Sequence, residues 1–144
     1  MFDLYEMQIV GGVLSGLDIW ENTFMNDFRG LIAYQKAYEN AMAIFELTKT
    51  FPGEEKYSLT TQIRNSSRSV CACLAEAYRK RLYEKHFISK LSDSDMENSE
   101  TMVWLDFALD CGYINERTRQ GLLSKYLEVG KLINFMMKNP DKFS

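Results

Sequence analysis

Apolar residues recur every three or four positions along four long stretches of the chain, the spacing that gathers them on one face of an α-helix. We predict helices over residues 26–50, 59–81, 84–111 and 116–138. Their expected inner faces, in chain order, are Phe28, Leu31, Tyr38, Met42 and Phe45; Leu59, Ile63, Val70, Leu74 and Ala77; Phe87, Leu91, Met102, Leu105 and Leu109; and Leu122, Tyr126, Ile133 and Met137. Because the breaks are short, successive helices should run antiparallel. The predicted fold class is all-α, an antiparallel up-down four-helix bundle.

Polar and glycine residues mark where these helices should begin and end. Residues suited to N-caps precede three of the four stretches: Asn26 or Asp27, Ser58 and Asn115. Pro52-Gly53 should end the first helix, because proline disfavours a helical residue before it. Gly112 is a natural residue to end the third helix.

The first part of the chain lacks this periodicity. Residues 1–25 are expected to form a short N-terminal extension and residues 26–144 the bundle domain. The first 28 residues contain no Lys or Arg, so the positively charged start of a secretory signal is missing. An odd number of cysteines (Cys71, Cys73 and Cys111) is a poor disulfide framework. We therefore expect a cytoplasmic protein.

Two helices carry more apolar residues than one inner face can hold. Large exposed apolar patches mark interfaces, so we predict a self-association surface from the surplus side chains. These are Ile44, Leu47, Phe51, Trp104 and Phe107. The alternative is a thick core, or cover by the apolar residues of the extension: Ile9, Val10, Leu14 and Trp20.

Catalytic and metal-binding patterns are missing from the sequence. A di-iron bundle needs Glu-x-x-His on two helices, but the only histidine is His86 and position 83 is not Glu. Cys71 and Cys73 would point about 200° apart on a helix, which is wrong for chelation. The serines lack elbow glycines, and no glycine-rich phosphate loop is present. We predict no enzyme activity, no metal site and no cofactor.

Charge is distributed unevenly along the 144 residues, although the net charge is only −3. Residues 1–28 carry five acids and no base, residues 64–90 carry a local +5, and residues 91–110 carry a local −6. A small total therefore does not exclude a polyanionic partner.

The basic segment should gather at one end of the bundle, which we call the basic pole. Here the second helix ends and the third begins, with Arg79, Lys80, Arg81 and Lys85, and the fourth helix adds Lys131, Lys138 and Lys142. The predicted nucleic-acid-binding residues are Arg64, Arg68, Arg79, Lys80, Arg81, Lys85 and Lys90, with Tyr78, Tyr83 and His86 able to stack on unpaired bases. The alternative is a solvated helix end whose cations complement the helix dipole. The acidic extension enters at this pole and could cover it, which is a further hypothesis.

Several motifs occur in an order that resembles one known family. Residues 51–64 read Phe-Pro-x-Glu-Glu-x-Tyr-x-Leu-x-x-Gln-Ile-Arg. Two further segments follow: Ser69-Val70 with Leu74-Ala75-Glu76-Ala77-x-Arg79, and Leu105-x-x-Ala108-x-x-x-Gly112-Tyr113-Ile114. Over about residues 28–138 they resemble a family of four-helix bundles that includes proteins encoded in intervening sequences of bacterial 23S ribosomal RNA genes.

This resemblance implies a cytoplasmic, non-enzymatic bundle that assembles into a ring, commonly a pentamer. The accessory protein of diversity-generating retroelements is similar in architecture, and there a basic pentamer binds RNA and a reverse transcriptase. Arg64 and Arg79 occupy the basic positions of the motif and Glu76 its acidic one. The chain departs from the usual pattern where Cys73 replaces Asn and Ala77 replaces Gly.

Two functions follow as hypotheses. The first is a homo-oligomeric RNA-binding adaptor that uses the basic pole, with RNA and a protein such as a reverse transcriptase as partners. The second is a protein-interaction scaffold, in which the adjacent basic and acidic segments pair between neighbouring subunits of a ring. A small-molecule binder is a weaker alternative, because no convergent polar set is evident.

Overall fold

The computed structural model describes residues 27–144, and their regular structure is helical throughout. Four long helices follow one another: α2 (Ile32–Thr48), α3 (Leu59–Arg79), α4 (Glu84–Asp110) and α5 (Glu116–Lys138). Three short 3₁₀ turns accompany them: η2 (Phe28–Gly30), η3 (Gly53–Glu55) and η4 (Pro140–Lys142). The predicted all-α four-helix bundle is confirmed. The predicted extension, residues 1–25, and the candidate cap Asn26 lie outside the described residues.

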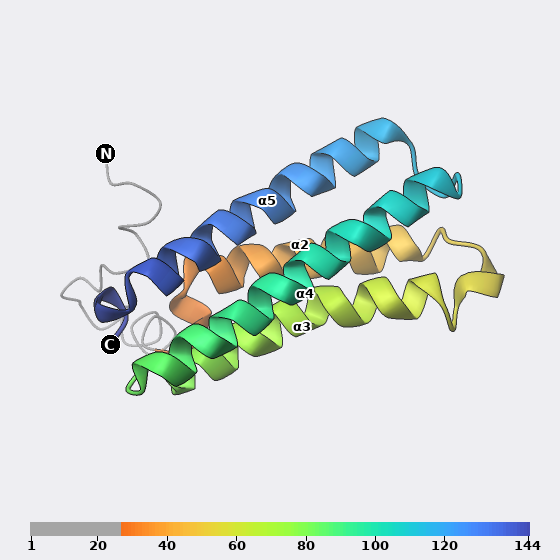
Figure 1. Cartoon of the computed structure of the whole chain (residues 1–144). Helices are drawn as coiled ribbons and strands as arrows, with labels where there is room; N and C mark the ends of the chain where they lie inside the picture. Colours follow the sequence, from red (N-terminus) through yellow and green to blue (C-terminus); the bar gives the residue numbers. More distant parts are fainter. Residues whose placement is uncertain (1–26) are drawn as a thin grey trace, which may run out of the picture.

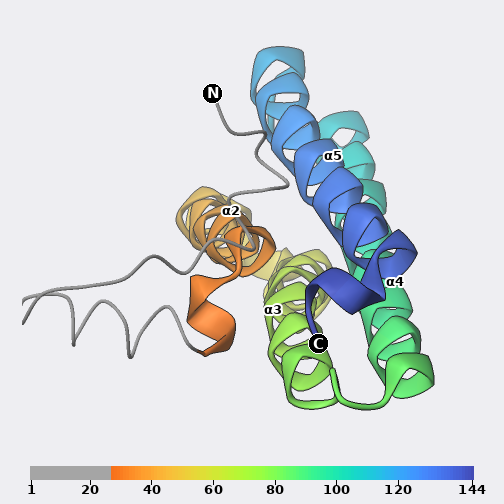
Figure 2. The same ribbon diagram turned by 90° about the vertical axis from the view of Figure 1, so that its left-hand side faces the viewer.

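The four helices run alternately up and down around a shared interior (Figures 1 and 2). α3 packs most extensively on α4, α4 packs on α5, and α2 closes the bundle against α3 and α5. An ion pair of 3.0 Å between Lys36 Nζ and Glu128 Oε1 joins α2 to α5. The basic pole is the end with η2, the α3–α4 turn and η4. We call the other end, with the α2–α3 connection and the α4–α5 turn, the opposite pole.

Two of the predicted helix ends have the expected geometry. Asn115 Oδ1 accepts a hydrogen bond of 2.8 Å from the Thr118 amide, capping α5. Gly112 has a φ of +79°, which favours glycine, and directly follows the C-cap of α4. The amides of Gly112 and Tyr113 donate to the carbonyls of Leu109 and Ala108, a Schellman arrangement that satisfies the last turn.

The start of the first helix differs from the prediction. Asp27 caps the short turn η2 by accepting a hydrogen bond of 2.7 Å from the Arg29 amide. Leu31 then adopts an extended conformation with ψ of 125°, its side chain is buried, and α2 begins at Ile32. Ser58 does precede α3, but its Oγ donates to Glu55 Oε1 instead of capping the helix.

The expected inner face of the first helix is only partly correct: Leu31 is buried, whereas Phe28 and Phe45 are half-buried. Tyr38 and Met42 are exposed, and α2 buries a neighbouring stripe: Ala33, Ala37, Asn40, Ala41, Ile44 and Thr48. Three of these six side chains are alanines. In the other helices most expected core positions are buried, whereas Met102, Leu109 and Met137 are half-buried and Met136 is buried beside Met137.

The interior consists of two apolar clusters, one toward each pole. Phe87, Leu74 and Ile133 belong to the cluster at the basic pole, and Ile63 and Leu105 to the other. Three buried hydrogen bonds join the helices of the interior: Ser94 Oγ donates to the Val70 carbonyl, Asn98 Nδ2 donates to the Tyr126 carbonyl, and Thr101 Oγ1 bonds to Ser66 Oγ. None of the helices within residues 27–144 combines the length and apolar character that crossing a membrane requires.

Candidate nucleic-acid interface

Exposed cations gather at the basic pole as the sequence predicts. Arg79 ends α3, Lys80 follows it, and Lys85 lies in the first turn of α4; all three are exposed. None of the three side chains forms a hydrogen bond or ion pair with another residue between 27 and 144. The turn between antiparallel α3 and α4 brings them together, so this end presents positive charge to solvent.

Arg81 lies at the same pole but is held against the protein. Its Nη1 donates a hydrogen bond of 2.9 Å to the Tyr78 carbonyl, and its guanidinium lies 4.0 Å from the centre of the Tyr78 ring. Tyr83 and His86 contact each other edge to face, with ring centres 6.1 Å apart. Together with Glu84 and Lys85 they line an open cavity of about 420 Å³.

Lys90 is tied to acids within the bundle, unlike the cations at the pole. Its Nζ lies 2.7 Å from Glu76 Oε2 on α3 and 3.6 Å from Asp93 Oδ2 on its own helix. The hydrogen bond to Glu76 raises the pKa of Lys90. This cation therefore joins α3 to α4, and its charge is already offset.

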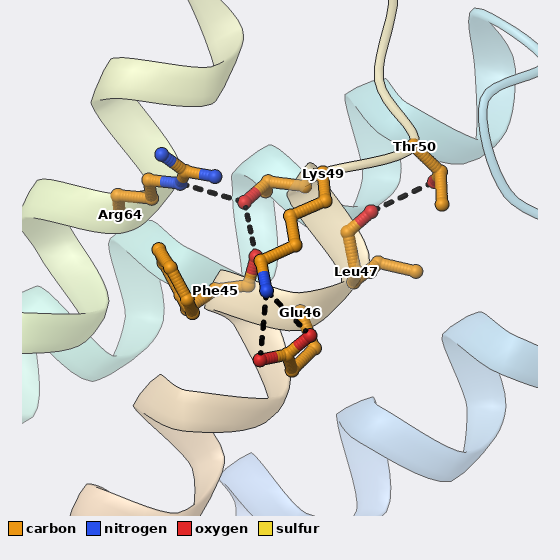
Figure 3. Close-up of polar contacts among 7 residues, drawn as sticks. Phe45, Glu46, Leu47, Lys49, Thr50 and Arg64 are labelled. Carbon is orange, nitrogen blue, oxygen red and sulfur yellow. Dashed lines mark hydrogen bonds and ion pairs between the residues drawn. The ribbon is translucent and has the colours of Figure 1, made fainter.

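Arg64 and Arg68 lie on α3 away from the pole. Arg64 reaches across to the end of α2, where its Nε donates a hydrogen bond of 2.7 Å to Thr48 Oγ1 and its guanidinium carbon lies 4.8 Å from the Phe45 ring centre (Figure 3). Arg68, one turn further along α3, is exposed. The structure thus divides the seven predicted cations among the pole, a helix-joining ion pair and a separate site on α2 and α3.

The residues predicted to form an oligomer interface fall into two groups, one buried and one partly exposed. Ile44 and Phe51 are buried in the cluster at the opposite pole, with exposures of 0% and 8%, so the expectation that they lie outside the core is wrong. Periodicity alone did not show which of two apolar stripes on α2 faces inward. Leu47 and Trp104 are half-buried, and Phe107 is 53% exposed.

Trp104 and Phe107 form an apolar surface on α4 that is flanked by acids. Their ring centres lie 5.8 Å apart, and both line an open cavity of about 400 Å³ with Tyr57 and Leu59. Trp104 Nε1 donates a hydrogen bond of 3.2 Å to Glu100 Oε1. Burial and the neighbouring Glu100 raise the pKa of Glu97 on the same helix.

The cysteines and the histidine show no arrangement for a metal. Within residues 27–144 no three His, Cys, Asp or Glu side chains come close enough to hold a metal ion. Cys71 is buried, and burial raises the pKa of its thiol to about 11. Cys73 is half-buried, and burial raises the pKa of its thiol as well.

Sequence reasoning did not single out Thr48 and assigned Phe45 only to the inner face of the first helix, whereas both position the Arg64 side chain. It also placed Tyr38 in the core, whereas 52% of this residue is exposed. Helical spacing of aromatic residues was a visible signal, but spacing does not distinguish an inner stripe from an outer one.

Comparison with known proteins defines the class of this bundle. A sequence model of the 23S rRNA-intervening sequence protein family matches residues 29–135. The chain therefore belongs to that family, in agreement with the resemblance carried by its motifs. No curated protein matches the chain.

A solved structure shares the fold. It is the crystal structure of a protein of unknown function from the S23 ribosomal protein family of Bacteroides thetaiotaomicron VPI-5482. The two chains are 28% identical, with a TM-score of 0.68. The match covers 74% of this chain and 96% of the other.

Proposed function

We propose that this chain is a non-enzymatic, cytoplasmic adaptor that associates with RNA through its basic pole and works as a homo-oligomer, a pentameric ring being the favoured assembly. It needs no cofactor. The observation that carries the proposal is the cluster of exposed cations Arg79, Lys80 and Lys85 at the α3–α4 turn, which have no side-chain partner among residues 27–144. Such a cluster can neutralise phosphates with release of counterions. A reverse transcriptase is the kind of protein partner that the family resemblance implies.

Charge reversal at the pole tests this proposal. Arg79→Glu combined with Arg81→Glu should abolish retention of RNA and leave the oligomeric mass unchanged, measured by sizing with light scattering. The matched control is Arg117→Glu, because Arg117 is an exposed cation in the first turn of α5 at the opposite pole. If Arg79→Glu with Arg81→Glu dissolves the oligomer, the pole serves assembly and the adaptor function is wrong.

The apolar surface on α4 favours a second function, assembly of a protein scaffold. Trp104 and Phe107 are partly exposed beside the acids Glu97 and Glu100, and a second copy of the chain carries cations that can pair with those acids. Trp104→Asp should then give monomers on sizing with light scattering. An unchanged mass would remove this surface from the interface.

A further inference from the structure

Arg64 has the geometry of a pre-positioned anion-binding side chain. Its Nε is used by the hydrogen bond to Thr48 Oγ1, and Thr48 in turn donates a hydrogen bond of 3.0 Å to the Phe45 carbonyl. The guanidinium lies over the Phe45 ring, which limits its rotation (Figure 3). The two terminal nitrogens form no hydrogen bond or ion pair with residues 27–144. A planar fork with two NH₂ groups that have no partner within residues 27–144 matches the oxygens of a phosphate group.

The other cation that contacts the Phe45 ring is already neutralised. Lys49 Nζ lies 4.7 Å from the same Phe45 ring centre, but it also lies 3.0 and 3.1 Å from the two carboxylate oxygens of Glu46. Of these two cations at the end of α2, the one whose charge is not offset within residues 27–144 is therefore Arg64. Arg68 adds a second charge one turn along α3, on the same side of the helix.

The antiparallel register places the exposed ring of Tyr38 and the half-buried ring of Tyr34 along the same pair of helices as these arginines. Near the end of α2, Arg64 contacts Phe45 and Thr48. Closer to the basic pole, Cys71 on α3 lies near Tyr34 on α2. The pKa of the Tyr34 hydroxyl is raised mainly by burial and further by Cys71. Along α3, Arg68 lies between Arg64 and Cys71. Along α2, Tyr38 lies between Phe45 and Tyr34. The rings of Tyr34 and Tyr38 lie 6.1 Å apart, and Tyr34 contacts Phe28 edge to face at 5.0 Å.

The aromatic row leads to the basic pole. An open cavity of about 500 Å³ at this end is lined by Tyr34, Tyr38, Arg29, Gln35 and Glu39. Arg29 is exposed and lies 4.4 Å from the Phe28 ring centre, although it also pairs with Asp27. Along α3 the distance from Arg64 to Arg79 corresponds to about 22 Å of helix. We call this strip, from Arg64 and Arg68 past Tyr38 and Tyr34 to the pole, the α2–α3 seam.

We infer that the α2–α3 seam is a track for single-stranded RNA, with phosphates at Arg64 and Arg68 and an unpaired base stacked on Tyr38. This rests on the proposed function and names the class of RNA that the adaptor takes. Exposed aromatic rings that alternate with cations are how proteins bind single strands, because every base has a face that can stack. A duplex keeps its bases paired and offers the seam only its phosphates. An acidic partner protein would use the arginines but has no need of Tyr38.

Binding of two labelled probes to the full chain tests the track: an oligouridine strand and an RNA duplex of equal length, followed by fluorescence anisotropy over a range of salt concentrations. Tyr38→Ala should weaken binding of the oligouridine about tenfold or more and leave duplex binding unchanged. Tyr38→Phe should retain the wild-type affinity, because the ring is kept. Arg64→Gln should lower the slope of log affinity against log salt for oligouridine by about 0.7, the value for one phosphate contact on a single strand.

Matched variants separate the seam from the pole and from assembly. Arg117→Gln, an exposed arginine on α5, should leave affinity and slope unchanged. If Tyr38→Ala and Arg64→Gln have no effect while Arg79→Glu with Arg81→Glu abolishes binding, the track is wrong and the adaptor function stands. If Arg64→Gln changes the oligomeric mass, the seam is a contact between copies, which also overturns the track. Absence of RNA binding by the unsubstituted chain would overturn both proposals.

Discussion

Lys90 Nζ lies 2.7 Å from Glu76 Oε2, so a cation predicted to contact nucleic acid instead joins α4 to α3. Fourteen positions separate the two residues in the sequence, and only the α3–α4 turn brings them together. The pair distinguishes the cations that are available to a polyanion from those that are not. It also shows that a local charge count overstates the charge a partner can use.

Lys90→Ala should therefore leave RNA affinity and its salt dependence nearly unchanged. The charge of Lys90 is offset by Glu76 and Asp93, whereas Lys85 at the pole has no partner within the described part of the chain. Lys85→Ala should weaken binding and reduce the slope of log affinity against log salt by about 0.7 for a single strand. The measurement is fluorescence anisotropy with the same labelled RNA. Equal losses for the two variants would show that the ion pair opens to contact RNA.

The buried hydroxyl pair between α3 and α4 should contribute measurably to stability. Thr101 Oγ1 and Ser66 Oγ lie 2.8 Å apart and both side chains are buried. Thr101→Val leaves Ser66 without this partner and should lower the free energy of unfolding by about 1–3 kcal/mol in urea denaturation. Ser124→Ala, an exposed substitution on α5, is the control and should change it by less than about 0.5 kcal/mol. The double variant Thr101→Val with Ser66→Ala tests whether the two hydroxyls are coupled. If its loss of unfolding free energy equals the sum of the two single losses, a direct coupling is contradicted.

Two glycines should respond in opposite directions to the same substitution. Gly112 has a φ of +79°, so Gly112→Ala should destabilise the protein by about 1–2 kcal/mol even though open space surrounds it. Gly121 lies within α5, is exposed, and also has open space around it. Gly121→Ala should stabilise the helix by about 0.5–1 kcal/mol. Thermal unfolding followed by circular dichroism measures both, and a lower Tm for Gly121→Ala would contradict this account of α5.

The acidic side of α4 should make stability depend on pH. The fold raises the pKa of Glu97 through burial and through Glu100, so it favours the protonated form. Protonated Glu97 stabilises the fold fully at pH values below the pKa that Glu97 has in the unfolded chain. This contribution is lost as the pH rises through the higher pKa that Glu97 has in the folded protein. Glu97→Gln keeps a neutral side chain and should raise the Tm by about 1–2 °C at pH 7, since the group is only half-buried.

The same substitution should have no effect near pH 3, where the native glutamate is already protonated. Glu54→Gln is the control, because Glu54 is an exposed acid in η3 and is not part of α4. A Tm gain for Glu97→Gln that is equal at both pH values would show that the effect is not the charge of Glu97.

Much of the fold could be predicted from local pattern. The helices α3, α4 and α5 lie within one or two residues of the predicted ranges, because apolar periodicity and local end signals depend on neighbours in sequence, although Ser58 precedes α3 without capping it. Asn115 caps the next helix and Gly112 ends the previous one for the same local reason. Less of the candidate site could be predicted, since its side chains come from different helices.

The chain by itself determined a four-helix bundle, the ends of most helices and the gathering of cations at one pole, because each depends on spacing or on neighbours in sequence. Tertiary structure decided which stripe of α2 faces inward, since packing of α2 against α3 and α5 buries Ala33 and Ala37 and leaves Tyr38 exposed. It also decided the roles of individual arginines and lysines. Arg64 is held by Thr48, sixteen positions away, and a hydrogen bond or ion pair between distant residues exists only once packing has brought the helices together.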